Sequence, residues 1–187
     1  IILVADAYGS PADRPILFAH GGGQTRHSWG RTAQKLAQKG WYALAYDHRG
    51  HGDSGWSSDG IYHLQRFAQD QKAITQHLPQ PPVVVGASLG GLAAMLAQGD
   101  SDDAVYSAIV LVDITPNMSE AGALNIIDFM SERTNEGFAT LEEAADIIAA
   151  YTDRPRRGDL SGLAKNLRLR DNGRYYWHWD PNFLTLS

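Results

Sequence analysis

The stretch that decides the fold is Val83-Val-Val-Gly-Ala-Ser-Leu-Gly-Gly91, which contains the pattern Gly-x-Ser-x-Gly with Ser88 at its centre. Three β-branched residues precede the pattern, and a run of strong helix formers, Leu92–Ala97, follows it. A strand, a tight turn and a helix in that order lift a serine hydroxyl clear of a sheet, as a nucleophile elbow requires. Gly86 and Gly90 are small enough to let the backbone turn sharply. The stretch predicts Ser88 as a nucleophile; the alternative is a glycine-rich turn with an idle serine.

Short apolar segments alternate with helical patterns over the first part of the chain. Each apolar segment is rich in Val, Ile, Leu or Ala and precedes Gly, Asp or His; the segments are Ile1–Ala5, Ile16–Ala19, Tyr42–Tyr46, Val83–Val85 and Ala108–Val112. The helical patterns between them are Thr32–Lys39, His63–Leu78 and Leu89–Gln98. Apolar strands alternating with helices are typical of a mostly parallel sheet with helices on both faces. The predicted fold class is therefore α/β.

The alternation stops after residue 115. Three helical patterns follow, which are Ser119–Arg133, Leu141–Tyr151 and Ser161–Arg168. Thr140 and Glu143 form a capping box at the start of the middle helix, in which each side chain accepts a backbone N–H. We therefore predict a core over residues 1–115 and a helical cap over residues 116–187. No further buried strand is evident, so we expect the core sheet to be incomplete.

Composition excludes several classes of protein. The chain has 187 residues and no Cys, which excludes disulfides, thiol nucleophiles and Cys-based metal sites. A net charge of −5 without a long basic run argues against nucleic acid as a partner. The apolar stretches are far shorter than the roughly 20 residues of a membrane span. We expect a cytoplasmic protein; the start at Ile1 looks trimmed and leaves an upstream signal peptide open, and a short edge strand leaves a homodimer open.

A second glycine-rich segment begins at His20, directly after a predicted strand. The three consecutive glycines that follow let a backbone approach a substrate closely with its N–H groups free. An oxyanion hole takes one N–H from such a loop and one from the residue after the nucleophile. These donors would be Gly22, with Gly23 in reserve, and Leu89. The alternative is a flexible surface loop.

These segments resemble the α/β-hydrolase superfamily. The matching segments, in order, are His20–Gly23, Asp47–Ser54, Gly86–Gly91 and Leu111–Ile114. The likeness is greatest to bacterial esterase-like and epoxide-hydrolase-like members with a helical lid. Ser88 stands where epoxide hydrolases and haloalkane dehalogenases carry Asp. The resemblance therefore implies ester cleavage or a related acyl transfer through an acyl-enzyme, without a metal or organic cofactor.

The acid and base of the predicted triad are harder to place. In this superfamily the order along the chain is Ser, then Asp or Glu, then His. Asp113 ends a predicted strand at a position that some members use for the acid, and His178 is the only histidine after Ser88. No strand is evident before His178, so the other expectation is that the true acid and histidine lie outside this sequence.

Aromatic and histidine side chains supply candidates for a substrate pocket. His27 and Trp29 lie shortly after the glycine loop, and Trp177 lies in an aromatic run, Tyr175–Trp179, that either packs the cap or walls an apolar pocket. A core role suits Trp29 equally. In the Asp47–Ser54 turn, two histidines and an Asp lie close together, but without the spacing of a metal-binding helix.

The leading hypothesis is a serine hydrolase that cleaves carboxylic esters of small or medium acyl groups. Lactone opening, perhydrolysis and carbon–carbon bond hydrolysis would use the same residues. The runner-up is a ligand-binding relative without activity, or an inactive fragment that lacks its catalytic histidine. A metal-dependent hydrolase using the His48 turn is a third hypothesis.

Overall fold

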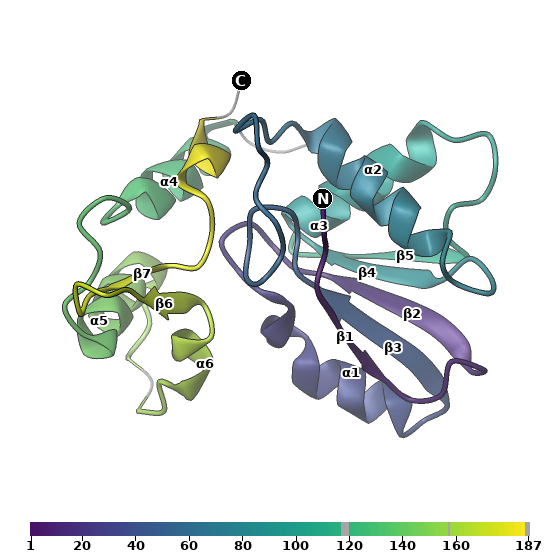
Figure 1. Ribbon diagram of the computed structural model, residues 1–187, viewed down its shortest axis with the longest axis horizontal. Coiled ribbons are helices and arrows are strands. Elements are labelled where there is room, and N and C mark those ends of the chain that lie inside the picture. The colour runs from purple at the N-terminus through teal and green to yellow at the C-terminus, as the bar shows by residue number, and fades with distance from the viewer. Residues whose placement is uncertain (117–119, 157, 186–187) are drawn as a thin grey trace.

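A five-stranded sheet forms the centre of the molecule, for which a computed structural model describes residues 1–116, 120–156 and 158–185 (Figure 1). The strands are β1 (Ala5–Tyr8), β2 (Arg14–Ala19), β3 (Trp41–Tyr46), β4 (Val83–Ala87) and β5 (Ala108–Val112). They lie in the order β1-β3-β2-β4-β5, and every neighbouring pair is parallel except β1 and β3. The predicted α/β class with a mostly parallel sheet is confirmed.

Helices cover both faces of this sheet, with α1 (Gly30–Ala37) on one side and α2 (Leu64–Thr75) and α3 (Leu89–Gly99) on the other (Figure 1). The apolar run in β2 serves both layers. Leu17 packs in the cluster with α2 and α3, whereas Phe18 packs in the cluster with α1. A strand buried on both faces needs apolar residues at consecutive positions, which explains why β2 lacks alternation.

The two edges of the sheet differ from the centre. The first strand was predicted at Ile1–Ala5, which is wrong: Ile1 and Ile2 are 59% and 78% exposed, and β1 begins at Ala5. The reason is that β1 is an edge strand with alternating exposure, so it lacks the continuous apolar pattern. At the other edge, β5 leaves Val110 and Val112 45% and 36% exposed.

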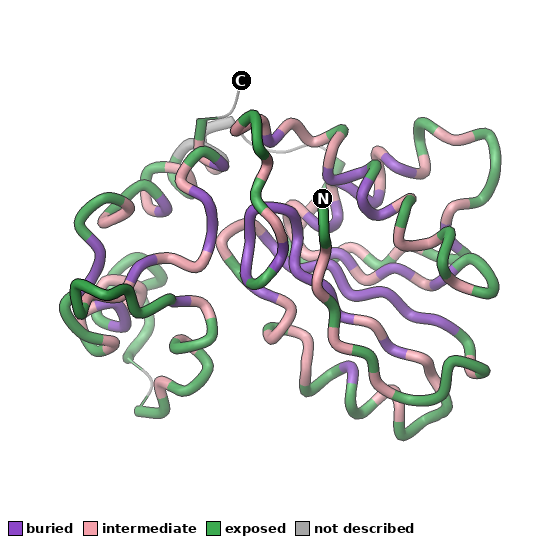
Figure 2. Tube along the Cα trace, viewed as in Figure 1, coloured by how far each residue is buried: buried purple, intermediate pink, exposed green. Residues whose placement is uncertain are grey.

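The cap forms a second lobe beside the core sheet and its helices, at the left of the view (Figure 1). Its helices are α4 (Glu120–Ser131), α5 (Leu141–Thr152) and α6 (Ser161–Ala164), and the predicted helix start at Ser119 lies outside the described residues. Figure 2 shows long buried stretches in the core strands and only short ones in the cap. The division at residues 115 and 116 stays a prediction.

The cap also contains two strands that were not predicted. β6 (Leu167–Leu169) and β7 (Tyr175–Trp177) form an antiparallel pair in a separate sheet, so the helix predicted to Arg168 ends at Ala164. They do not extend the core sheet, whose incompleteness stays a prediction. The signal was present: Asn172 and Gly173 form the turn, with Gly173 at φ 74°. Strands of three residues are too short to show a periodic pattern.

Candidate active site

Ser88 lies on a strained turn between β4 and α3. Its φ of 44° and ψ of −115° are unfavourable for a residue with a side chain. The glycines around it are required by close backbone approach: a Cβ on Gly86 would lie 2.6 Å from the Gly91 nitrogen, and one on Gly90 would lie 2.5 Å from the Ala19 carbonyl oxygen. Ser88 itself is half-buried. The predicted strand–turn–helix is therefore present with the serine at its apex.

Buried polar residues hold this turn in place. The Ser88 N–H donates to the Val112 carbonyl at 3.2 Å. On the helix side, the Gln71 amide donates to the Gly90 carbonyl at 3.0 Å and accepts from the Tyr106 hydroxyl at 2.7 Å. Gln71 is fully buried. Sequence analysis missed Gln71 and Tyr106, because neither belongs to a motif and both reach the elbow from distant segments.

The glycine loop lies against the elbow and leaves one N–H free. The Gly21 N–H donates to the Gln24 side chain at 3.1 Å, and the Gly23 N–H donates to His51 Nε2 at 3.1 Å. The Gly22 N–H has no hydrogen-bond partner among the described residues. A Cβ on Gly21 would lie 3.5 Å from the Ser88 Cβ, so the loop borders the serine.

The second predicted donor is Leu89, the first residue of α3. An N–H at the first helical position has no carbonyl one turn earlier to bind. The N–H groups that bind the Ser88 carbonyl belong to Gly91 and Leu92, at 2.9 Å each. Within the described structure, the Leu89 N–H and the Gly22 N–H are thus unpaired donors near Ser88, whereas the reserve donor Gly23 is occupied.

Three fully buried histidines support the glycine loop. His20 Nδ1 donates to the Gly21 carbonyl at 2.8 Å, and His20 Nε2 accepts the His48 N–H at 3.0 Å. His48 Nε2 donates to the His20 carbonyl at 2.9 Å, and His48 Nδ1 accepts from the Tyr46 hydroxyl at 3.0 Å. His51 Nδ1 donates to the Arg49 carbonyl at 3.0 Å while Nε2 accepts from the loop. In each ring, one nitrogen donates to a carbonyl and the other accepts from an N–H or O–H group, which is the pattern of a neutral tautomer.

Burial keeps these rings uncharged. It lowers the pKa of His20 to about 4 and the pKa of His51 to about 3, and it lowers the pKa of His48 well below its usual value. Every ring nitrogen already has a partner, so His48 and His51 offer no lone pair to a metal ion. The described residues contain no group of three or more His, Asp or Glu side chains that could hold one.

The turn that carries His48 and His51 folds around a buried carboxylate. Asp47 accepts the Arg26 N–H at 2.6 Å and the Asp53 N–H at 3.0 Å, and it also pairs with the Arg26 guanidinium. A Cβ on Gly52 would lie 2.3 Å from an Asp47 oxygen, which makes glycine obligatory there. The guanidinium also binds Asp53 at 2.8 Å and lowers the pKa of that carboxyl.

The predicted acid and base lie in different surroundings. Asp113 follows β5 at φ 55° with an exposed side chain, next to Val112, which binds the elbow. His178 follows β7, contrary to the expectation that no strand precedes it. Its Nε2 lies 3.8 Å from Asp53 Oδ1 and forms no hydrogen bond within the described structure. Burial lowers the pKa of His178, with Asp53 opposing that effect. A pairing of His178 with Ser88 and Asp113 therefore stays a prediction.

The predicted pocket residues are dispersed. His27 lies 3.7 Å from Asp6 and lines a cleft between core and cap. Trp29 packs on Phe18, with ring centroids 5.2 Å apart, as its core alternative expected. Trp177 contacts Phe138 at 5.0 Å between ring centroids.

Apolar side chains not singled out in the sequence cover the glycine loop. Phe183 lies in the 3₁₀ helix η2 (Pro181–Leu184), and its ring would be 3.2 Å from a Cβ on Gly22. It packs with buried residues from both lobes, which are Tyr62, Phe67, Ala93, Met130 and Trp179, and the Leu89 side chain lies against them. We call this group the apolar cluster. Its members come from segments that are far apart in the sequence, so no local pattern identifies it.

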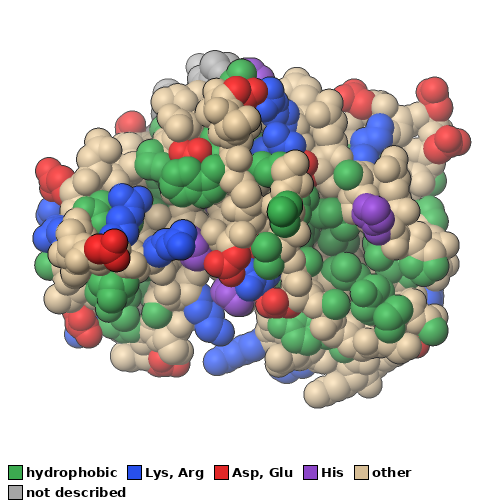
Figure 3. All heavy atoms as spheres, in the orientation of Figure 1, with side chains coloured by type: hydrophobic (Ala, Val, Ile, Leu, Met, Phe, Trp, Pro, Cys, Tyr) green, Lys and Arg blue, Asp and Glu red, His purple; other side chains and the backbone are tan. Residues whose placement is uncertain are grey.

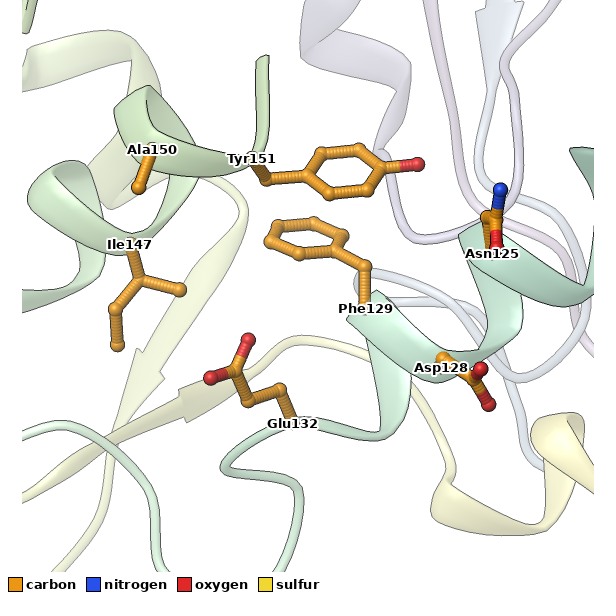
Figure 4. A pocket seen from close by; sticks show the side chains of 7 residues that line it. All are labelled: Asn125, Asp128, Phe129, Glu132, Ile147, Ala150 and Tyr151. Atoms are coloured by element: carbon orange, nitrogen blue, oxygen red, sulfur yellow. The ribbon is translucent and has the colours of Figure 1, made fainter. Parts of the chain in front are cut away.

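A hollow of about 720 Å³ between α4 and α5 lies apart from Ser88 (Figure 4). Phe129 and Tyr151 stack in it with ring centroids 3.9 Å apart, and its other lining residues also come from the cap. It does not include the elbow.

The chain matches known proteins over most of its length. A family model described as the alpha/beta hydrolase fold matches residues 14–174. The chain belongs to this family. As an α/β hydrolase, it is 33% identical over 181 residues to the esterase Rv0045c of Mycobacterium tuberculosis, covering 92% of this chain and 58% of that protein. The solved structure of that esterase superposes with a TM-score of 0.73, covering 99% of this chain and 64% of the other, at 30% identity.

Other α/β hydrolases show the same relation. An α/β hydrolase from Novosphingobium aromaticivorans superposes with a TM-score of 0.81 at 26% identity, covering 97% of this chain and 64% of that one. A monoacylglycerol lipase of Mycolicibacterium smegmatis is 33% identical over 101 residues, which are 51% of this chain and 36% of that lipase. The chain thus spans less than two thirds of these relatives. No described helix is long and apolar enough to cross a membrane.

Proposed function

We propose that the chain carries the nucleophile and oxyanion hole of a serine esterase for small or medium acyl groups. The observation that carries the proposal is the position of Ser88 on its strained turn beside two unpaired N–H groups, those of Gly22 and Leu89. Likeness to an esterase and to a monoacylglycerol lipase supports the same class of reaction.

In the proposed reaction, Ser88 Oγ attacks the ester carbonyl carbon and its proton passes to a histidine base. The carbonyl oxygen becomes an oxyanion and accepts hydrogen bonds from Gly22 and Leu89; losing one such donor typically costs about 3 kcal/mol. The base then protonates the departing alcohol. Water, activated by the same base, hydrolyses the acyl-enzyme. Lactone opening, perhydrolysis and carbon–carbon bond hydrolysis would begin at the same nucleophile.

The apolar cluster is the proposed site for the acyl group. It includes the side chain of Leu89 and the ring of Phe183, which covers Gly22. Apolar walls exclude water from the carbonyl and strengthen the oxyanion hydrogen bonds. Bulky rings so close to the donors favour short acyl chains over long ones.

The histidine base is the part of the triad that needs a direct test. His178, with Asp113 as the acid, is the candidate within this sequence, but the contacts of His178 lead to Asp53. This observation favours a second candidate function: a protein that binds esters at the elbow and does not turn them over.

A fluorophosphonate distinguishes the two functions, because it reacts only with an activated serine. We expect one adduct on the intact protein, mapped to Ser88 by peptide mass spectrometry. Ser88→Ala should abolish it, and Ser107→Ala, a matched change at an exposed serine, should not. A folded protein that gains no adduct would overturn the esterase proposal and favour ligand binding.

A further inference from the structure

A large cleft lies between the core and the cap, away from the elbow. Its volume is about 850 Å³, and it is lined by η1 (Arg26–Ser28) and α1 on one side and by α5, α6 and residues 154–156 and 159–160 on the other. None of its lining residues belongs to the glycine loop or to the elbow. Figure 3 shows Lys and Arg side chains gathered where the two lobes meet.

The cations in this cleft are mostly unpaired. Arg31, Arg154 and Lys165 line it, and none of them forms an ion pair with a described carboxylate. Arg156 also lines the cleft but is neutralised by Asp146 at 3.4 Å. Elsewhere in the described chain, four arginines pair with carboxylates, as Arg26–Asp47, Arg49–Asp70, Arg66–Asp59 and Arg133–Glu136, and four others do not.

One carboxylate lines the cleft, and it is already engaged. Asp159 accepts the Ser161 N–H at 2.9 Å, and this hydrogen bond, together with the charge of Arg31, lowers the pKa of its carboxyl. Among the described lining residues, the three cations without an ion pair and this one carboxylate leave two positive charges in excess, in a chain whose net charge is −5. A concave site with one sign of charge concentrates the field and attracts an anion.

The cap side of the cleft carries apolar residues beside its charged ones. Ile148 and Ala149 of α5 and Leu160 and Leu163 near α6 contribute to its lining. Cations around an apolar wall suit a ligand with both an anionic group and a hydrocarbon part.

We propose that this cleft binds a phosphate monoester that carries a short alkyl chain. A phosphate monoester has a charge near −2 at neutral pH, which matches the excess charge of the lining. Its oxygens accept from Arg31, Arg154 and Lys165, and its alkyl chain packs on Ile148. The proposal is independent of the reaction at Ser88, because the two sites share no residue.

Isothermal titration calorimetry of the full chain with hexyl phosphate tests this. Binding should be detected and should weaken about tenfold in Arg31→Gln and in Lys165→Gln, as expected for one charge-assisted hydrogen bond. Lys39→Gln is the matched control, because Lys39 is an exposed cation beyond the end of α1 and outside the cleft. Equal affinity in the cleft variants and the control, or no binding at all, would overturn the proposal.

Two further probes test the two halves of the ligand. Hexanol should not bind measurably, and inorganic phosphate should bind more weakly than hexyl phosphate and be unaffected by Ile148→Asn. Hexanol binding as tightly as hexyl phosphate would refute the anion site, and inorganic phosphate binding as tightly would refute the alkyl contact. Sedimentation with phosphatidylcholine vesicles containing phosphatidic acid distinguishes a lipid source of the phosphate monoester from a soluble one.

Discussion

His20, His48 and His51 lie fully buried in the core, with a hydrogen-bond partner on each ring nitrogen, whereas His178 in the cap keeps its Nε2 without one. The three core histidines lie at the glycine loop. In each of them, protonating the second ring nitrogen would break the hydrogen bond that this nitrogen accepts. His178 has the free nitrogen that a base requires, but it faces Asp53 at 3.8 Å. A ring nitrogen without a partner and the group that it faces, rather than nearness to the glycine loop, therefore decide which histidine can act as a base.

The largest effect of the three buried core histidines should be on the stability of the protein at acidic pH. Burial lowers the pKa of His20 to about 4 and that of His51 to about 3, from 6.5 in each case. Below about pH 6.5 the unfolded chain therefore binds protons that the folded protein excludes, and the free energy of unfolding falls as the pH falls. We expect a loss on the order of 1 kcal/mol per pH unit for each histidine. Urea unfolding at several pH values measures it.

NMR titration of the imidazole signals provides the control for this result. The signals of His20, His48 and His51 should not shift until the pH is well below 6.5. A buried ring that titrates near its ordinary value would contradict the comparison.

His51→Leu should have the next largest effect. The substitution leaves the Gly23 N–H and the Arg49 carbonyl without partners in the interior, and the cost should be about 3 kcal/mol in the free energy of unfolding. It should also reduce the slope of stability against pH. His77→Leu, at an exposed histidine, is the matched control and should change stability by less than about 0.5 kcal/mol. Equal stability of the two variants would mean that the ring does not hold the loop.

Gly23→Ala should be milder. Gly23 has φ 76°, and an added Cβ would lie 2.9 Å from the flexible end of Met130. Backbone strain should dominate and cost about 1 to 2 kcal/mol. At Gly99, the last residue of α3, an added Cβ meets open space, so Gly99→Ala should leave stability unchanged or raise it slightly. Thermal unfolding of both variants provides the test, and an undiminished melting temperature for Gly23→Ala would exclude strain in the loop.

His178→Ala should have the smallest effect. The hydrogen bonds of His178 use its backbone: its N–H donates to the Asn166 carbonyl at 3.0 Å, and its carbonyl accepts the Gly52 N–H at 2.7 Å. Alanine keeps both, so stability should fall by less than about 1 kcal/mol. The rate of fluorophosphonate labelling at Ser88 should change by less than about threefold. A loss of roughly a thousandfold or more would instead identify His178 as the base.

Local sequence was sufficient for the elbow. The order of β-branched residues, glycines and helix formers around Ser88 determines a strand, a turn and a helix, because each of these depends on neighbouring residues. The capping box is equally local: the Glu143 N–H donates to the Thr140 hydroxyl at 3.1 Å, although the Glu143 carboxylate reaches the Ala139 N–H instead of that of Thr140.

Contacts between distant segments were not accessible in this way. The acceptor for the Gly23 N–H is His51, and the residue that fixes the elbow helix is Gln71; neither pair has a spacing rule. The short β6–β7 hairpin was missed for a different reason. A helical pattern that ran to Arg168 overlapped β6, and the Asn172-Gly173 turn alone did not outweigh it. Sequence thus predicted the local strand, turn and helix around Ser88 better than the distant residues that support them.

The exposed valines of β5 have a practical consequence for handling the polypeptide. In the described structure β5 forms one edge of the sheet, with Val110 and Val112 partly open to solvent. An apolar strand edge is a template for another strand, and apolar association strengthens in sulfate and phosphate salts. A concentrated solution of this polypeptide in such buffers should therefore form oligomers before it precipitates. Val110→Lys should delay the precipitation.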